Sequence, residues 1–406
     1  MDNKISDKKD VCSIVFTGDI AFSKVFADGW KNEGCLDKTV SDFLKSADHV
    51  IANVESPLTS GDFSAKKDLL HASDPEAGKF LWNNHMRIWS LANNHISDCG
   101  EQGVMDTLQC AGNNKCHVIG AGRNLEEASQ TLILGNEVKI GILSFAGLRE
   151  NIRAGEDHPG ALTWDREDLI QKRISELRKG ADWVVLVIHG MDEFYNMPSP
   201  NQRERYHKYL DYGADIIIGH HPHVVQNYEK VGKKVIFYSI GNFIFGTDYQ
   251  KQFMHTDCGM LIRLDFSKES FDWTPFPVKI DFEKAAVQHG DIPDIFCNID
   301  EKNYKLIWSL ESRRIPLLTQ VKKIVRKKIY PDRGIKGWIK NTYRWFRKFL
   351  HTTERKNELV RLSSYLNRWK HSPLKEVVTY ICTDEKYLKD RLKTELELYD
   401  QKRGKK

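Results

Sequence analysis

The stretch that decides the fold spans residues 183–245 and reads WVVLVIHGMDEFYNMPSPNQRERYHKYLDYGADIIIGHHPHVVQNYEKVGKKVIFYSIGNFIF. It contains three short apolar runs rich in valine and isoleucine, at 183–188, 214–218 and 235–240. Runs of this kind are too short for capped helices and are typical of parallel strands that are buried on both faces. We therefore predict neighbouring parallel strands at the centre of an α/β fold.

Polar residues follow each of these three strands. His189 ends the first run, His220, His221 and His223 follow the second, and Asn242 follows the third. In open α/β sheets, ligands bind outside the carboxyl ends of the strands. Three histidines within four residues have no evident packing purpose. The sequence therefore predicts a functional site at this edge, and a metal centre in particular.

Strand and helix patterns alternate along the rest of the first 285 residues. We expect further strands at 11–17, 50–52, 86–91, 116–119, 138–145, 260–266 and 276–280, and helices at 36–47, 73–83, 101–112, 165–180 and 200–212. This alternation is typical of an α/β sandwich with its helices outside and its polar strand ends on one rim.

The earlier strands also end in residues that can carry chemistry. Asp19 follows the first strand, Asn53 and Glu55 follow the second, and Asn94 and His95 follow the third. Taken singly, each could cap a turn or lie in a surface loop. Because all are expected at one rim, they support one another. Carboxylate, amide and imidazole ligands together suit a borderline divalent ion such as Mn²⁺, Fe²⁺ or Zn²⁺.

The composition places the chain among globular proteins. Its 406 residues, 40% hydrophobic and 29% charged, leave room for one large domain and an appendage. No apolar run approaches the roughly 20 residues that span a bilayer. The first ten residues lack the apolar segment of a signal peptide. The eight cysteines show no CxxC pairing, which favours a reduced, cytoplasmic location.

The charge divides the chain into unlike parts. Residues 1–300 carry a net charge of −12, whereas residues 301–406 carry +17. We expect an N-terminal tail at 1–10, one domain at 11–285, and a basic, mostly helical C-terminal extension at 286–406. In 313–349, basic residues alternate with aromatic ones, which suits an anionic membrane surface at the inner face of the membrane.

Two other readings of this basic segment stay open. It could be a helical appendage that packs on the catalytic domain and covers its acidic surface. Nucleic acid is the least expected partner, because no recognised nucleic-acid module is present.

Several motifs resemble the CapA family of poly-γ-glutamate capsule synthesis proteins, which is similar to the calcineurin-like metallophosphoesterases. They are GD at 18–19, NVESPLT at 53–59, ANNHISDCG at 92–100, HGMDEF at 189–194, GADIIIGHHPHVVQ at 213–226 and YSIGNFIF at 238–245. The resemblance covers about residues 12–266 and keeps the family's motif order. It implies a four-layer α/β/β/α metallophosphoesterase-like sandwich.

The resemblance also implies a role for each site residue. The metal ligands it implies are Asp19, Glu55 (as the bridging carboxylate), Asn94, His189, His221 and His223. His95 resembles the catalytic histidine that does not bind metal, and Asp98 could orient its ring or only cap the following helix. Side chains expected to support the ligands or contact the substrate are Asn53, His220, Glu193 and Asn242.

The first motif departs from the metallophosphoesterase pattern. The sequence reads Asp19-Ile20-Ala21, so alanine stands where those enzymes have a second ligand, histidine. Glu55 likewise stands where they have aspartate. We therefore expect one or two ions, and His220 could replace the missing ligand.

The function implied is a metal-dependent hydrolase that acts in capsule, poly-γ-glutamate or surface polysaccharide synthesis. Water activated by the metal would attack a phosphate-containing or capsule-polymer substrate, and His95 would protonate the leaving oxygen. The alternative is a non-catalytic, metal-binding scaffold protein of a capsule synthesis machinery. The histidine set favours the enzyme, whereas Ala21 favours the scaffold.

Overall fold

The structure is a computed structural model, and it describes residues 11–61, 71–147, 152–253, 255–305, 307–309 and 311–312. The chain forms two compact units, Met1–Ile299 and Asp300–Lys406. The boundary expected after residue 285 falls inside the first unit, because β16 (Ala286–His289) pairs with β15 (Phe271–Asp281). The basic and aromatic segment 313–349 lies outside the described residues. The labelled strands and helices all belong to the first unit.

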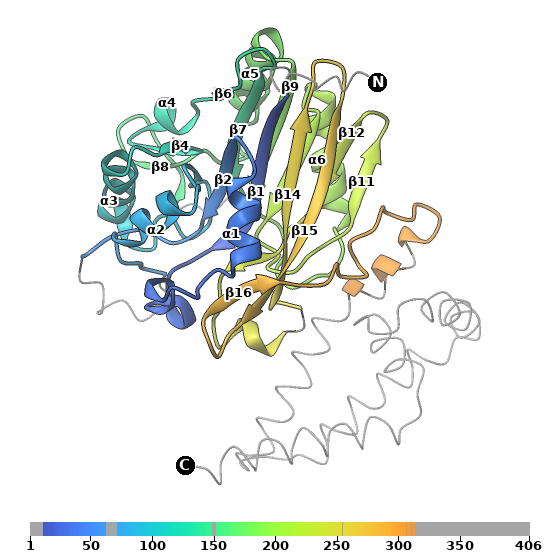
Figure 1. The fold of residues 1–406 in the computed structure, drawn as a ribbon. Coiled ribbons are helices and arrows are strands. Elements are labelled where there is room, and N and C mark those ends of the chain that lie inside the picture. Colours follow the sequence, from blue (N-terminus) through green and yellow to red (C-terminus); the bar gives the residue numbers. More distant parts are fainter. Residues whose placement is uncertain are drawn as a thin grey trace, which may run out of the picture. The chain divides into compact units, whose positions relative to one another are not determined.

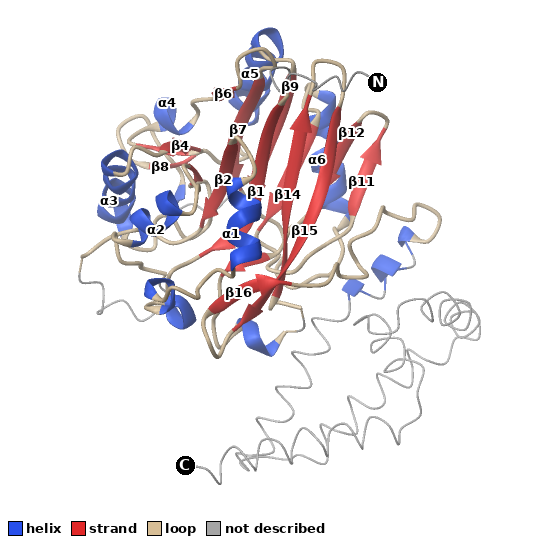
Figure 2. Ribbon diagram, viewed as in Figure 1, coloured by secondary structure: helices blue, strands red, loops and turns tan. Residues whose placement is uncertain are grey.

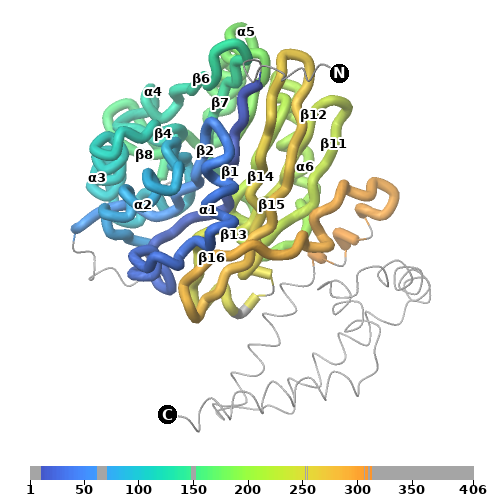
Figure 3. Tube along the Cα trace, in the orientation of Figure 1, coloured from blue at the N-terminus to red at the C-terminus, as the bar shows by residue number. Residues whose placement is uncertain are grey.

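Within the described residues, the strands form an eight-stranded sheet, a six-stranded sheet and a small two-stranded one (Figures 1 and 2). The first sheet has the order β16-β15-β14-β1-β2-β3-β4, with β13 paired to β1. Besides β15 and β16 it comprises β1 (Cys12–Ile20), β2 (His49–Val54), β3 (Ile88–Ser90), β4 (His117–Ile119), β13 (Asn242–Ile244) and β14 (Cys258–Phe266). In Figure 3, β1 lies between β2 and the late strand β14, so both ends of the unit meet in this sheet.

The second sheet contains the three apolar runs and has the order β11-β12-β10-β9-β7-β6. Its strands are β6 (Leu132–Leu134), β7 (Ile140–Ala146), β9 (Trp183–His189), β10 (Ile216–His220), β11 (Tyr228–Val231) and β12 (Lys234–Phe237). β10 pairs in parallel with both β9 and β12, so Ile217 lies opposite Leu186 and Ile236. The predicted parallel strands are thus confirmed. The small sheet pairs β5 (Ala121–Gly122) with β8 (Gly160–Ala161).

The two large sheets pack face to face. Alternate residues of β1 point to opposite faces, as in any strand. Ile14 and Phe16 join a buried cluster that also takes Val185 and Ile218 from the second sheet. Val15, between them, joins a different cluster on the opposite face. One core therefore lies between the sheets, and a second lies outside the first sheet.

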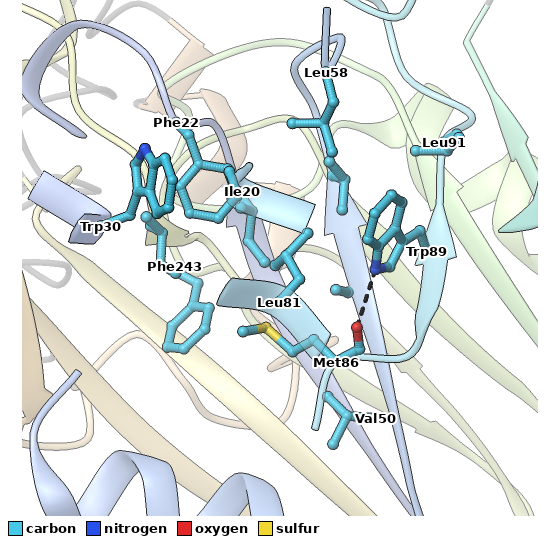
Figure 4. Packing of buried hydrophobic residues seen from close by; sticks show 14 of the residues in the cluster. Ile20, Phe22, Trp30, Val50, Leu58, Leu81, Met86, Trp89, Leu91 and Phe243 are labelled. Atoms are coloured by element: carbon cyan, nitrogen blue, oxygen red, sulfur yellow. Dashed lines mark hydrogen bonds between the residues drawn. The ribbon is translucent and has the colours of Figure 1, made fainter. Parts of the chain in front are cut away.

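Helices cover the outer faces. Over the first sheet lie α1 (Lys38–Lys45), α2 (Ala77–Asn83) and α3 (Gly100–Asn113), and over the second lie α5 (Glu167–Gly180) and α6 (Pro200–Asp211). Figure 4 shows Leu81 of α2 packed near Trp89 of β3, whose indole nitrogen donates to the Met86 carbonyl at 3.0 Å. On the other side, the rings of Tyr209 in α6 and Phe145 in β7 lie 5.0 Å apart. This is the expected four-layer α/β/β/α sandwich. The short helix α4 (Leu125–Ala128) packs on the small sheet.

One expected helix begins later than predicted. The pattern at 73–83 gives a helix only from Ala77, because Ser73 bonds to another segment instead of capping. Its N–H donates to the Pro57 carbonyl and its carbonyl accepts from the Thr59 N–H, both at 2.9 Å. In the described part of the chain, no helix is both long enough and apolar enough to cross a bilayer.

Candidate metal centre

Strand ends from both sheets meet at one place. In the first sheet, Asp19 of β1 lies opposite Asn53 of β2. In the second sheet, His189 of β9 lies opposite His220 of β10. The Nδ1 of His220 donates to Asp19 Oδ1 at 2.9 Å, which joins the two sheets at this edge. Side chains that are up to 201 residues apart in sequence thus share one buried site.

Two glycines allow the backbones to come this close. A Cβ on Gly18 would lie 2.4 Å from the Gly241 carbonyl oxygen, and one on Gly219 would lie 2.1 Å from the Tyr238 carbonyl oxygen. Real side chains do not tolerate such distances. The glycines that precede Asp19 and His220 are therefore required by close packing of neighbouring chains.

Glu55 lies at the middle of the site. Its side chain is fully buried, and neither carboxylate oxygen accepts a hydrogen bond. Oε1 faces three imidazole nitrogens: Nε2 of His189 at 3.5 Å, of His223 at 3.6 Å and of His95 at 3.8 Å. Burial raises the pKa of Glu55 well above its ordinary value. Buried polar groups without partners are rare and costly, so this arrangement fits a carboxylate that binds a cation.

The possible ligands form two groups that share Glu55. Asp19, Glu55 and His189 make one group, and Glu55, His221 and His223 make the other. In each group the ligand atoms lie within 4.8 Å of one another, and all these residues are buried. The donor set of carboxylates and imidazoles suits a divalent metal ion. Each group could hold one ion, with Glu55 common to both.

Asp19 is held by its neighbours. Asn53 donates from Nδ2 to Asp19 Oδ1 at 2.8 Å and to Nδ1 of His189 at 3.1 Å, so one amide orients two candidate ligands. Burial would raise the pKa of Asp19, but the hydrogen bonds from His220 and His223 outweigh it and hold that pKa well below its ordinary value. Asp19 is therefore a buried carboxylate that stays ionised, as a ligand must be.

The 219–223 loop is strained at both of its candidate ligands. His221 and His223 have φ values of 95° and 56°, a region that costs non-glycine residues about 1–3 kcal/mol. His223 is held there because its Nδ1 donates to Asn242 Oδ1 at 2.9 Å. Burial would lower the pKa of His223, but Glu55 and Asp19 outweigh it and raise that pKa to about 10. Such strain persists only where the surroundings determine the conformation, which is common at functional sites.

Two more expected site residues lie at the edge of this cluster. The amide oxygen of Asn94 is 2.6 Å from Nε2 of His189, within reach of the first ligand group. Glu193 is partly exposed, and its carboxylate lies 3.9 Å from Nε2 of His221. All the side chains that the sequence singled out are thus brought to one site.

His95 and Asp98 form a pair beside the cluster. Nδ1 of His95 lies 2.9 Å from Asp98 Oδ2, and the opposite nitrogen faces Glu55. The N-cap residue of α3 is Cys99, not Asp98. Asp98 is therefore placed to orient the imidazole, and the capping alternative does not describe it.

The alanine of the first motif has no substitute ligand. Ala21 is buried, and its N–H donates to the Ile244 carbonyl at 2.7 Å. His220 belongs to neither ligand group and is bonded to Asp19 instead. His220 thus supports a ligand and does not replace the missing one.

Sequence reasoning missed two residues at this site, Ser23 and His71. His71 is buried, its ring centroid lies 4.4 Å from that of His95, and its Nδ1 lies 2.7 Å from Ser23 Oγ. Residues 60–72 show neither strand nor helix periodicity, so no pattern in the sequence pointed to His71.

Solved structures with a similar fold include a 5'-nucleotidase precursor from Thermus thermophilus. It is 13% identical, with a TM-score of 0.41, and the match covers 68% of this chain and 56% of that chain.

Two curated relatives are more similar in sequence. The PGA biosynthesis protein CapA of Bacillus subtilis (strain 168) is 35% identical over 243 residues, which are 58% of this chain and 64% of the relative. The capsule biosynthesis protein CapA of Bacillus anthracis is 28% identical over 302 residues, which are 71% of this chain and 72% of the relative. This chain thus spans less than two thirds of the length of the Bacillus subtilis protein.

The family model described as "Bacterial capsule synthesis protein PGA_cap" matches residues 13–247. This range holds every strand end that contributes to the site, from Asp19 to Asn242. The resemblance seen in the motifs is confirmed, and the chain belongs to the bacterial capsule synthesis protein family PGA_cap.

Proposed function

We propose that this protein is a metal-dependent hydrolase of the phosphoesterase type that acts in capsule, poly-γ-glutamate or surface polysaccharide synthesis. One observation carries the proposal: the buried Glu55 carboxylate, without hydrogen bonds, faces imidazoles from three different loops, and one of these belongs to the His95–Asp98 pair. The names of the two CapA relatives support the biological setting.

The cofactor in this proposal is one or two divalent ions, with Mn²⁺, Fe²⁺ or Zn²⁺ suited to the donor set. The residues that would hold them are Asp19, Glu55, Asn94, His189, His221 and His223. When bound, such ions supply Lewis acidity and make water a stronger nucleophile at neutral pH. Asn53, His220 and Asn242 keep the ligands oriented through their hydrogen bonds to His189, Asp19 and His223.

The part played by the chain itself is proton transfer. His95 holds a proton on Nε2, the nitrogen that faces the cluster, and gives it to the leaving oxygen of the substrate. Asp98 accepts the Nδ1 hydrogen and stabilises the charged imidazole before the transfer. General acid catalysis of this kind is worth typically about 10²–10⁴-fold in rate.

The test uses the purified full chain with Mn²⁺ and aryl phosphate esters whose leaving groups differ in pKa. His95→Ala should keep its metal content and lose roughly 10²-fold in turnover on a poor leaving group. A nitrophenyl ester should suffer much less, because nitrophenolate needs little protonation. The exposed His117 on β4 offers the matched control, since His117→Ala should change neither rate.

Two outcomes would count against the proposal. An equal loss on both leaving groups would make His95 a positioning residue. No turnover by the wild type with Mn²⁺, Fe²⁺ or Zn²⁺ would favour the second candidate, a non-catalytic metal-binding assembly protein of a capsule synthesis machinery. The observation that favours this candidate is Ala21, which leaves the first motif one ligand short.

The substrate in this proposal is a phosphate-containing compound or the capsule polymer itself. The protein acts in the cytoplasm, at the inner face of the membrane, and residues 313–349 contact its anionic lipids through their basic and aromatic side chains. Nucleic acid is not the expected partner.

A further inference from the structure

His71 is bonded to the same carboxylate oxygen as the proposed proton donor. Its backbone N–H donates to Asp98 Oδ2 at 2.9 Å, and Nδ1 of His95 lies 2.9 Å from that oxygen. The ring of His71 packs edge-on against the His95 ring, with centroids 4.4 Å apart and planes at 75°. Both members of the His95–Asp98 pair thus have His71 as a direct neighbour.

The ring of His71 is itself held in place. Ser23 Oγ lies 2.7 Å from its Nδ1, and the ring of Phe245 lies 5.3 Å away. The side chain is 1% exposed. A buried imidazole with one fixed hydrogen bond has little freedom to rotate.

His71 also connects three loops that leave the ends of neighbouring strands. Ser23 follows β1, and Asp98 follows β3. Ser73, two residues after His71, pairs with the loop after β2 through its backbone and through a 2.6 Å hydrogen bond to Ser56. Displacement of His71 would therefore be felt at all three strand ends.

His71 is not suited to carry the proton itself. Burial, with His95 and His223 as further causes, lowers the pKa of His71 to about 2. The ring is accordingly neutral at any working pH. Its contribution is one of position.

From this geometry we infer that His71, fixed by Ser23, is a positioning residue that holds the His95–Asp98 pair in its reactive orientation. The inference rests on the proposed function in that it gives the pair a task. The geometric part, that His71 and Ser23 hold the His95 ring, can be tested without any turnover.

The first readout is the Nδ1 hydrogen of His95, observed by NMR of ¹⁵N-histidine-labelled, Zn²⁺-loaded full chain and assigned with His95→Gln. In the wild type this hydrogen should exchange slowly with water, because Asp98 accepts it in a half-buried site. His71→Ala and Ser23→Ala should each speed the exchange about tenfold or more. His71→Asn, whose side-chain oxygen can accept the Ser23 hydroxyl, should restore part of the protection.

The second readout is turnover on the poor leaving group. His71→Ala and Ser23→Ala should lower kcat about 10-fold to 10²-fold and leave KM and metal content unchanged, since a small misplacement of a catalytic group costs this much. His117→Ala should match the wild type in both readouts.

The outcomes separate the inference from the proposed function. Exchange and kcat that stay at wild-type values in Ser23→Ala and His71→Ala would overturn the inference. Faster exchange in both variants with no turnover in the wild type would support the positioning and refute the hydrolase. If His71→Ala did not fold, Ser23→Ala and His71→Asn would decide, because both keep a buried polar or small side chain of compatible size.

Discussion

Replacement of Glu55 by methionine should have opposite effects on stability with and without metal. Methionine has nearly the length of glutamate but no oxygen. In the metal-free protein Glu55 is fully buried, and neither of its oxygens accepts a hydrogen bond. Leaving a buried polar group unsatisfied costs about 1–3 kcal/mol. Without metal, Glu55→Met should therefore be as stable as the wild type or more stable, by up to about 3 kcal/mol.

Metal should reverse this order. A ligand at 100 times its Kd stabilises the folded state by about 2.7 kcal/mol. The wild type should gain that amount, which at roughly 2 °C per kcal/mol for a domain of this size is a rise of about 5 °C in Tm. Glu55 belongs to both candidate ligand groups, so Glu55→Met should gain almost nothing.

The assay is differential scanning calorimetry of chelator-treated protein, with EDTA and then with Mn²⁺. Glu229 provides the matched control because it is also buried but has partners: Arg203 at 2.8 Å, His207 at 2.9 Å and Tyr238 at 2.6 Å. Glu229→Met should lose about 2–4 kcal/mol in both conditions, because it leaves Arg203 without its carboxylate. It should still show the full Mn²⁺ shift.

Two results would refute the reasoning. If Glu55→Met lost as much stability in EDTA as Glu229→Met, Glu55 would be a structural residue. If Glu55→Met kept the wild-type Mn²⁺ shift, Glu55 would not be a ligand.

Three further predictions concern other parts of the chain. His221→Ala should remove at least one equivalent of divalent ion from the purified protein, as measured by elemental analysis, and an unchanged metal content would contradict its assignment. The full chain should sediment with anionic liposomes and be released as salt rises, whereas a chain ending at residue 299 should not bind; equal binding by both would exclude residues 313–349 as the contact. Burial would raise the pKa of Glu229, but the hydrogen bonds from Arg203 and Tyr238 outweigh it and lower that pKa. The stability it contributes should therefore be complete above its unfolded pKa of about 4.3 and be lost as pH falls through its lower folded pKa. Unfolding measured in EDTA against pH should show this loss in the wild type, and the same loss in Glu229→Gln would contradict the attribution.

The sequence by itself was sufficient for the framework of the site. Residues 183–188, 214–218 and 235–240 are runs of β-branched residues, and such runs pack as buried parallel strands whatever their surroundings. Because parallel strands end at a common edge, the polar residues that follow them could be placed together from residue order alone. The family resemblance rested on the same strand ends, and it was confirmed there.

Only the tertiary structure decided how these side chains are shared. Hydrogen bonds between His220 and Asp19, or between His71 and Ser23, depend on how two sheets and three loops pack, and no local periodicity encodes that. The same holds for Glu55: its sequence context does not reveal that its carboxylate is buried without a hydrogen bond. Residue type and spacing determine which strands form and where they end, because those are local properties of the chain. Which polar atoms are satisfied, and which are left for a cation, depends on contacts between distant segments and is settled only when the sheets pack.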